Sequence, residues 1–131
     1  MKLVKSQHKH GCAIACLAMI TGKTYKQVAA YLTKTRREDL NRAGMYDCEI
    51  EELAEDMGWH TTGFIYGFAT IPYFVRKTKA TCIVSFMPRK RAKQKYQHCV
   101  VYDADKRWFL DPEPPFVFKK ELVTSVMYIW H

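Results

Sequence analysis

A cysteine stands where a polar, basic segment changes to an uninterrupted apolar run. The stretch QHKHGCAIACLAM covers residues 7–19, and every residue from Cys12 to Ile20 is apolar or small. This run predicts a buried helix that begins at Cys12 and is ended by Thr21 and Gly22. A thiol at the first position of a helix lies near unpaired N–H groups and the positive end of the helix dipole, which favour the thiolate. Cys12 is therefore the best-placed thiol for attack on a carbonyl carbon.

The other four cysteines are weaker candidates for a nucleophile. Cys16 lies one turn deeper in the same apolar run, and Cys82 and Cys99 lie inside apolar strand patterns, so packing explains all three. Cys48 stands at the start of a later helix, but no polar cluster adjoins it.

Thiol catalysis also requires a general base, a group that orients the base, and donors for the oxyanion. His98 opens a predicted strand, HCVVYD, and Asp111 ends the next one, RWFLD, across the tight turn DADK. In such a hairpin the two positions lie close together, so the carboxylate can hold one imidazole nitrogen while the other faces the thiol. Gln7, five residues before Cys12, can direct its side-chain amide at the oxyanion.

Each of these features alone has a common structural explanation. A cysteine at a helix start is usually structural, a histidine at a strand start is usually a surface or capping residue, and Asp-Pro is a common turn. Their joint order of Gln, Cys, His and Asp, on an early buried helix and a late hairpin, is much less expected by chance.

The elements that would position these residues follow in a helices-first order. TYKQ at 24–27 matches a capping box that opens an amphipathic helix, and Asp47 can cap a third helix that Gly58 ends. TIPYFVRKT is typical of a short helix, and strands are predicted for WHTTGFIYGF in part, ATCIVSFMP, QHCVVYD, RWFLD, PFVFK and TSVMYIWH. This order predicts an α+β fold with the helices on one side of an antiparallel sheet.

Composition and charge limit the classes of function that the chain could have. The 131 residues, 48% of them hydrophobic, suit one globular domain over residues 1–131. No apolar stretch approaches the ~18 residues of a membrane span, so we expect no association with a membrane. The odd number of cysteines favours reduced thiols, so we expect a cytoplasmic protein. The net charge is +8, and the basic loop, which we define as Arg89, Lys90, Arg91, Lys93 and Lys95, is either a solvated connection or a docking surface for an acidic partner.

Several strings together resemble a known family. CAIACLAMI preceded by Gln7, then KQVAAYL, EELAEDMGW, and IVSF with HCVVYD and WFLDP, are similar to the C39 group of papain-like cysteine peptidases. That group comprises the peptidase domains attached to bacteriocin-exporting ABC transporters and their stand-alone relatives. The resemblance covers roughly residues 5–125. It implies a papain-like fold with N-terminal helices packed on a C-terminal antiparallel β-sheet.

The resemblance also implies a role for each candidate residue. Cys12 would be the nucleophile, His98 the general base and acid, Asp111 the orienting carboxylate, and Gln7 with the Cys12 backbone N–H the oxyanion hole. No cofactor is implied, and the substrate would be a peptide, cut after small residues such as a Gly-Gly pair. Around the nucleophile the family commonly has Asp-Cys-Gly, whereas this chain has Gly-Cys-Ala at 11–13.

Three other functions stay open at this stage. A catalytically silent peptidase-like module, recruited by a bacterium or a phage, could dock an acidic partner through the basic loop. A metal site could combine His8, His10 and Cys12 with Cys16 or His98, although no CxxC spacing supports it. The basic surface could also bind nucleic acid by itself.

Overall fold

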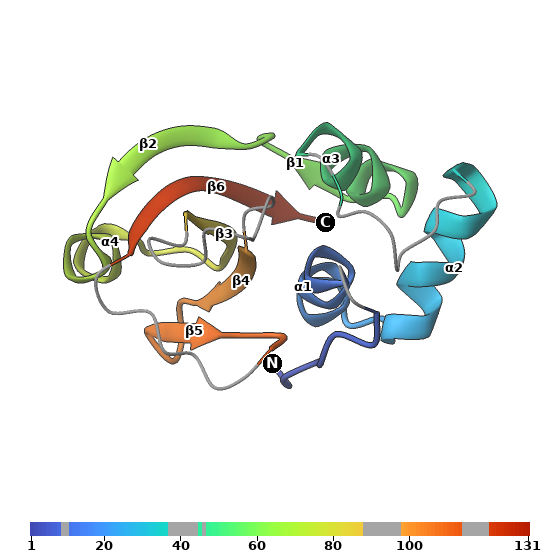
Figure 1. Cartoon of the computed structure of the whole chain (residues 1–131), viewed down its shortest axis with the longest axis horizontal. Helices are drawn as coiled ribbons and strands as arrows, with labels where there is room; N and C mark the ends of the chain where they lie inside the picture. Colours follow the sequence, from blue (N-terminus) through green and yellow to red (C-terminus); the bar gives the residue numbers. More distant parts are fainter. Residues whose placement is uncertain (9–10, 37–44, 46, 88–97, 114–120) are drawn as a thin grey trace.

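The chain folds as an α+β protein in which helices cover an antiparallel sheet (Figure 1). The computed structural model describes residues 1–8, 11–36, 45, 47–87, 98–113 and 121–131. Its helices are α1 (Cys12–Thr21), α2 (Tyr25–Arg36), α3 (Asp47–Asp56) and α4 (Ile71–Lys77). Its strands are β1 (His60–Thr61), β2 (Ile65–Ala69), β3 (Cys82–Met87), β4 (His98–Asp103), β5 (Trp108–Leu110) and β6 (Leu122–Trp130). The strand predicted for PFVFK falls outside the described residues.

Local signals in the sequence determine where α1 and α2 begin and end. Helix α1 starts at Cys12 and stops at Gly22, whose φ of 75° is the left-handed conformation that glycine adopts without strain. The predicted capping box is confirmed, because Gln27 N–H donates to Thr24 Oγ1 at 3.1 Å and Thr24 N–H donates to Gln27 Oε1 at 2.9 Å. The nucleophile candidate is thus the first residue of a helix.

The last strand, β6, lies inside the sheet with neighbours on both of its edges. The strand order is β1-β6-β3-β4-β5, and β2 pairs with the same edge of β6 as β1. All of these pairs are antiparallel. Strands β3 and β4 are buried along their described side chains, as their near-continuous apolar sequences require.

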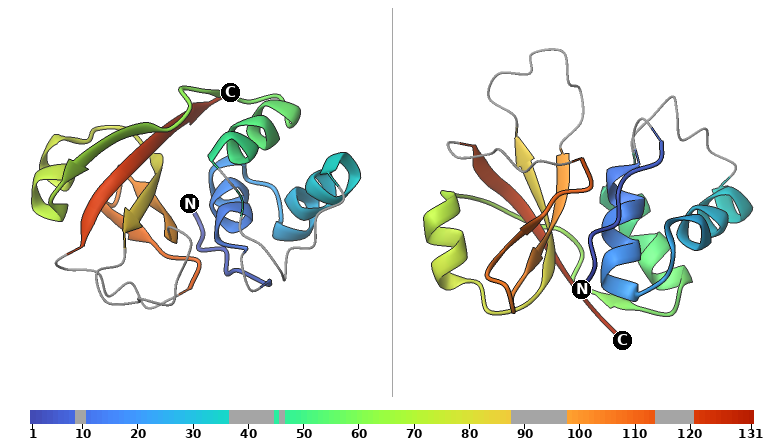
Figure 2. Two further views of the ribbon diagram at one scale, coloured as in Figure 1. Left: turned by 45° about the horizontal axis from the view of Figure 1, so that its top comes forward. Right: turned by 90° about the horizontal axis from the view of Figure 1, so that it is seen from below.

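Both faces of the sheet are covered, so the prediction that all helices lie on one side is wrong for α4. Helices α1, α2 and α3 lie on one face, where α1 packs on β4. Helix α4 lies on the opposite face of the sheet (Figure 2). There the Phe74 ring meets the aromatic rings of Tyr102 and Phe109. The reason is that β3 and β4 carry apolar side chains on both faces of the sheet, so the second face must also be shielded from water.

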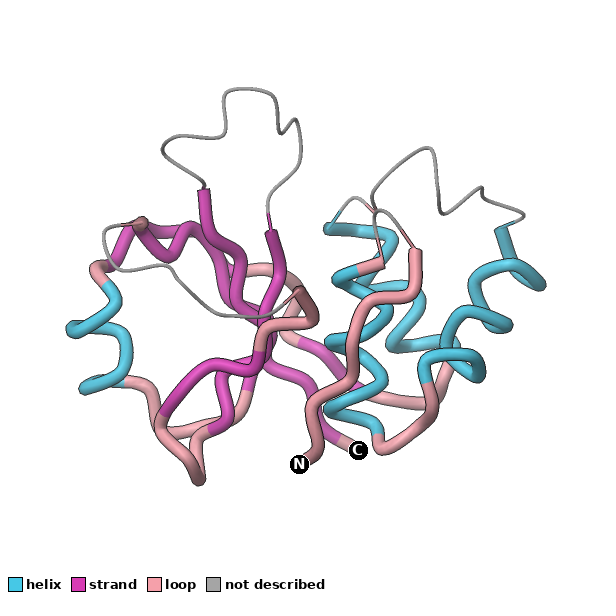
Figure 3. The backbone as a smooth tube through the Cα atoms, turned by 60° about the horizontal axis from the view of Figure 1, so that its bottom comes forward, coloured by secondary structure: helices cyan, strands magenta, loops and turns pink. Residues whose placement is uncertain are grey.

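The N-terminal segment runs alongside α1 toward the start of that helix (Figure 3). Ser6 N–H donates to the carbonyl oxygen of Pro112 at 3.0 Å, and Lys106 Nζ donates to the carbonyl oxygen of Met1 at 3.4 Å. The segment is therefore held between the first helix and the β4–β5 hairpin. Within the described residues, no helix has the length and apolar content needed to cross a bilayer.

Candidate active site

A buried histidine and a buried aspartate meet at one end of the β4–β5 hairpin. His98 Nε2 and Asp111 Oδ1 are 2.7 Å apart, and both side chains are almost fully buried. Asp111 Oδ1 also accepts the backbone N–H of Glu113 at 2.8 Å. The carboxylate is thus fixed by its own turn while it holds one nitrogen of the imidazole.

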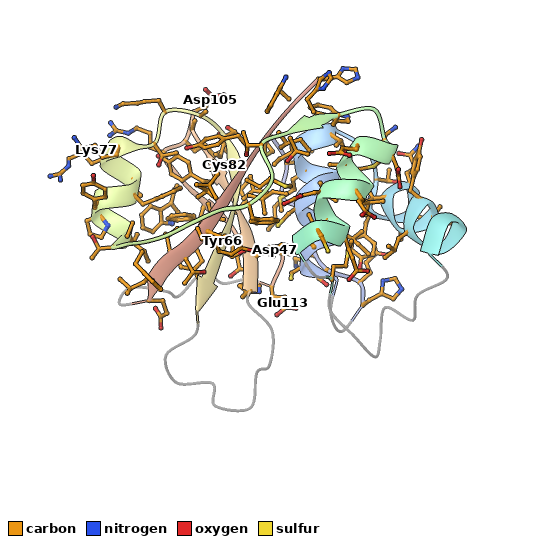
Figure 4. The ribbon with its side chains drawn as sticks, turned by 90° about the horizontal axis from the view of Figure 1, so that it is seen from above. Asp47, Tyr66, Lys77, Cys82, Asp105 and Glu113 are labelled. Atoms are coloured by element: carbon orange, nitrogen blue, oxygen red, sulfur yellow. The ribbon has the colours of Figure 1, made fainter. Side chains whose placement is uncertain are left out.

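The hairpin register brings these two side chains together. Val101 pairs with Leu110 and Asp103 with Trp108, so Asp111 follows β5 at the end where β4 begins. The turn at the other end is closed by Asp103 Oδ1, which accepts the backbone N–H of Asp105 at 3.0 Å. Figure 4 shows Asp105 and Glu113 at opposite ends of this hairpin. The proximity expected from the sequence is present, and it follows from a short turn and an antiparallel ladder.

Cys12 brings a thiol to the same place from the helical layer. It is partly exposed, whereas the seven residues that follow it in α1 are buried. Cys12 packs against the hydrophobic cluster that contains Cys99, and the side chains of Cys99 and His98 lie close enough to its sulfur to act on the pKa of the thiol. The packing of α1 on β4 thus brings together the predicted nucleophile and the predicted base.

These contacts favour the charged form of both partners. The hydrogen bond from Cys99 is the largest cause that lowers the pKa of Cys12 well below its ordinary value, and the hydrogen bond and positive charge of His98 lower it further against the effect of burial. Burial alone would lower the pKa of His98, but the hydrogen bonds to Asp111 and Cys12 outweigh burial and raise it to about 10. The shifts of both groups favour a thiolate beside an imidazolium.

Cys99 is a member of this site that the sequence patterns assigned to packing. Its side chain is 5% exposed, faces α1, and lies 3.6 Å from the hydroxyl oxygen of Ser85 across the β3–β4 pair. The hydrogen bond with Cys12, followed by burial, raises the pKa of Cys99 well above its ordinary value. Burial, with a contribution from the charge of Cys12, likewise raises the pKa of Cys16. Cys99 therefore stays a protonated donor to the nucleophile.

Gly11 is required by the packing around the start of α1. A Cβ at this position would overlap the hydroxyl of Tyr25, the first residue of α2. That hydroxyl is 2.8 Å from His8 Nδ1, and the two rings stack with centroids 5.5 Å apart. The side chain that the C39 family commonly carries before its nucleophile therefore has no room here. Ala13, where the family commonly has glycine, is buried in the core.

Gln7 lies in the segment that precedes α1, and its side chain is exposed. The residues on either side of it are held in place, because Ser6 N–H donates to the carbonyl oxygen of Pro112 at 3.0 Å and His8 Nδ1 lies 2.8 Å from the Tyr25 hydroxyl. The main chain that carries Gln7 is thus anchored to α2 beside the start of α1. Its role as an oxyanion donor stays a prediction.

Two earlier hypotheses concern residues outside the described part of the chain. The basic loop at Arg89, Lys90, Arg91, Lys93 and Lys95 is one of them, and His10 of the hypothetical metal site is another. Among the residues that the structure describes, no group of three or more His, Cys, Asp or Glu side chains could hold a metal ion. In the described structure His8 instead pairs with Tyr25.

Comparison with known proteins adds no family. No protein-family model matches the chain, and no curated protein is similar enough in sequence to count as a match.

Proposed function

We propose that this chain is a C39-like cysteine peptidase with a papain-like fold. The observation that supports this proposal most strongly is the buried His98–Asp111 pair beside the Cys12 thiol, at the first residue of a buried helix. The three side chains come from the helical layer and from one hairpin of the sheet. The proposed base thus lies between the proposed nucleophile and the proposed orienting acid, the order that acyl transfer through a thiol requires.

In the proposed reaction the Cys12 thiolate attacks the carbonyl carbon of a peptide bond. The thiolate is ready before substrate arrives, because His98 carries a proton and lies beside it. The positive end of the α1 dipole adds to this stabilisation. Asp111 holds the ring through Nε2, so Nδ1 is the nitrogen assigned to the thiol.

The attack places a negative charge on the former carbonyl oxygen, and two donors are proposed for it. One is the backbone N–H of Cys12 at the start of α1, where the preceding Gly11 has no side chain that could cap the helix. The other is the side-chain amide of Gln7, which is carried on the anchored segment just before α1. Preorganised donors of this kind contribute much of the rate acceleration in acyl transfer.

The tetrahedral intermediate then collapses as His98 donates its proton to the leaving amine. The C–N bond breaks, the amine departs, and the acyl group remains on Cys12 as a thioester. The now neutral His98 accepts a proton from water, which attacks the thioester and releases the acid product and the Cys12 thiolate. Asp111 keeps the ring oriented and stabilises the imidazolium in both half-reactions.

The proposed substrate is a peptide or protein segment with small residues at the cleavage site, and the proposed location is the cytoplasm. The small-residue preference comes from the resemblance to the leader-cleaving members of the C39 group. Cys12 is only partly exposed and is flanked by the buried Gly11 and Ala13, a setting that favours a substrate with little side-chain bulk near the scissile bond.

The test compares Cys12→Ala with Cys48→Ala, a matched change at an exposed cysteine of α3. Peptides with an internal Gly-Gly pair are incubated with each protein, and products are identified by mass spectrometry. We expect cleavage by the wild type and by Cys48→Ala, with none by Cys12→Ala. Iodoacetamide at neutral pH should label Cys12 first.

Two outcomes would contradict the proposal. Labelling confined to another cysteine would remove Cys12 as nucleophile. Tight binding of a peptide that Cys12→Ala retains, without turnover by any variant, would instead support the silent binding module.

A further inference from the structure

Cys99 places a second thiol against the proposed nucleophile. The two residues lie on different elements, Cys12 at the start of α1 and Cys99 as the second residue of β4. Helix α1 packs on β4, and Cys12 packs against the hydrophobic cluster that contains Cys99. The interaction between the two thiols is also the largest cause that lowers the pKa of Cys12. Cys99 is buried, and its sulfur lies 3.6 Å from the Ser85 hydroxyl oxygen. The peptidase mechanism requires no second thiol at this position.

We propose that Cys12 and Cys99 form a reversible disulfide when the protein meets a peroxide, and that this bond switches the site off. The formation of the bond depends only on the two thiols and the imidazole, whereas its inhibitory consequence rests on the proposed peptidase function. The oxidant is hydrogen peroxide or an organic hydroperoxide, and the reductant that reopens the site is a small thiol or a dithiol protein.

The first step oxidises Cys12. Its thiolate attacks one oxygen of hydrogen peroxide, the O–O bond breaks, and Cys12 becomes a sulfenic acid. The departing hydroxide takes the proton of the His98 imidazolium and leaves as water. Cys12 is the thiol that reacts, because it is both partly exposed and stabilised as a thiolate.

The second step uses Cys99. While Cys12 is a thiolate, its negative charge helps to hold the Cys99 proton in place. The sulfenic acid is neutral, so it no longer opposes a negative charge on Cys99. The neutral imidazole of His98 can then accept the Cys99 proton. The Cys99 sulfur then attacks the Cys12 sulfur, the S–O bond breaks, and hydroxide leaves and is protonated by His98. In total, two thiols and one hydrogen peroxide give one disulfide and two waters.

The other cysteines are less suited to this second step. Cys82 belongs to the hydrophobic cluster on the α4 face of the sheet, away from Cys12. Cys48 is exposed on α3. Cys16 lies one helical turn after Cys12 on the same helix, and the charge of Cys12 contributes to raising the pKa of Cys16. The hydrogen bond that lowers the pKa of the nucleophile, however, comes from Cys99.

A buried partner is an advantage in this reaction. Cys99 needs to reach only Cys12 and not solvent, and burial with a raised pKa protects it from direct oxidation. Disulfide formation also removes the sulfenic acid before a second peroxide can convert it to the irreversible sulfinic acid. The pair would thus preserve the nucleophile during oxidative exposure.

The test exposes the full chain to hydrogen peroxide, blocks free thiols with an alkylating agent, and maps the cysteine peptides by mass spectrometry. We expect a cross-linked pair of peptides containing Cys12 and Cys99, with the loss of two hydrogen atoms, which dithiothreitol reverses. In Cys99→Ala, Cys12 should advance to the sulfinic acid under the same treatment. Cys48→Ala and Cys16→Ala should still form the Cys12–Cys99 link.

The readouts separate this proposal from the peptidase function. Sulfinic acid at Cys12 of the wild type without any cross-link, or a link from Cys12 to Cys16, would overturn the disulfide even if peptide cleavage is observed. A Cys12–Cys99 link in a protein that cleaves no peptide would support the disulfide and count against the peptidase. If both hold, peroxide should abolish cleavage and dithiothreitol should restore it in the wild type, while the loss should be permanent in Cys99→Ala.

Discussion

Ser6 donates its backbone N–H to the carbonyl oxygen of Pro112 at 3.0 Å, directly beside Asp111. This bond joins the segment that leads into the nucleophile's helix to the turn that holds the orienting carboxylate. The proposed site is split between two parts of the chain that are distant in sequence, and here the two parts share a main-chain hydrogen bond. Their separation is therefore restrained independently of the Cys12–His98 contact.

The pH dependence of Cys12 alkylation provides the first prediction. The interactions with Cys99 and His98 hold the pKa of Cys12 well below its ordinary value, so the thiolate persists to lower pH than the thiolate of free cysteine. Alkylation should therefore stay fast at pH values where free cysteine is already protonated, and it should decline only as the pH falls through that lowered pKa. Iodoacetamide rates measured against pH test this, with free cysteine as the control. A midpoint at or above that of free cysteine would contradict it.

Peptide cleavage should require both the thiolate and the imidazolium. It is lost on the acid side as Cys12 gains a proton, and on the alkaline side as His98 loses one near its pKa of about 10. In Asp111→Asn the carboxylate that raises the pKa of His98 is gone, so the alkaline limb should move to lower pH. The same change should reduce kcat/KM by roughly 10²- to 10⁴-fold, the usual contribution of positioned acid–base groups.

A merely structural role for Asp111 would give a different pattern. Activity would then fall at every pH in proportion to the folded fraction, and the alkaline limb would keep its position. Circular dichroism at each pH provides the control for folding.

Cys99 should influence the nucleophile even without oxidant. Its hydrogen bond is the largest cause that lowers the pKa of Cys12, so Cys99→Ala should move the alkylation midpoint of Cys12 to higher pH. Cys99→Ser keeps a hydrogen-bond donor at the same position, so it should shift the alkylation midpoint of Cys12 less than Cys99→Ala does. Equal midpoints for the wild type and both variants would show that the side chain of Cys99 does not act on the thiolate. Cys82→Ala, in the other hydrophobic cluster, is the control for the loss of a buried thiol.

The parts of the fold that local sequence signals determine could be predicted. The junction at Cys12, the Thr24–Gln27 capping box and Gly22 mark helix ends through groups within a few residues, and the structure has these ends. The approach of His98 to Asp111 could also be predicted, because a short turn and an antiparallel ladder leave little freedom in the register.

The remaining features depend on contacts between distant elements. HCVVYD is apolar on both faces, so its pattern does not tell which face meets a helix, and Cys99 resembles ordinary packing. Its nearness to Cys12 depends on how α1 packs on β4, which no local periodicity encodes. The same holds for the position of α4 and for the Tyr25 hydroxyl against Gly11.

The contact between Gly11 and Tyr25 leads to a stability prediction. Gly11→Ala forces a methyl group into the space of the Tyr25 hydroxyl, and such overpacking typically costs about 1–3 kcal/mol of unfolding free energy. Urea unfolding followed by circular dichroism measures this. Tyr25→Phe removes the hydroxyl, so the double variant should lose less stability than the two single losses combined. Strict additivity of the single changes would show that the two groups do not collide.

The exposed Gln7 side chain provides the last prediction. If its amide supports the oxyanion, Gln7→Ala should lower kcat by about 10²- to 10³-fold while KM changes little, because this interaction forms only in the transition state. Alkylation of Cys12 passes through no oxyanion and should keep its rate and pH midpoint. Gln7→Glu keeps the size of the side chain but places a negative charge near the oxyanion, so it should be no more active than Gln7→Ala. A variant that loses both alkylation and cleavage has instead lost the anchoring of the segment around Gln7 to Tyr25. Unchanged cleavage by Gln7→Ala would leave the Cys12 backbone N–H as the sole proposed oxyanion donor.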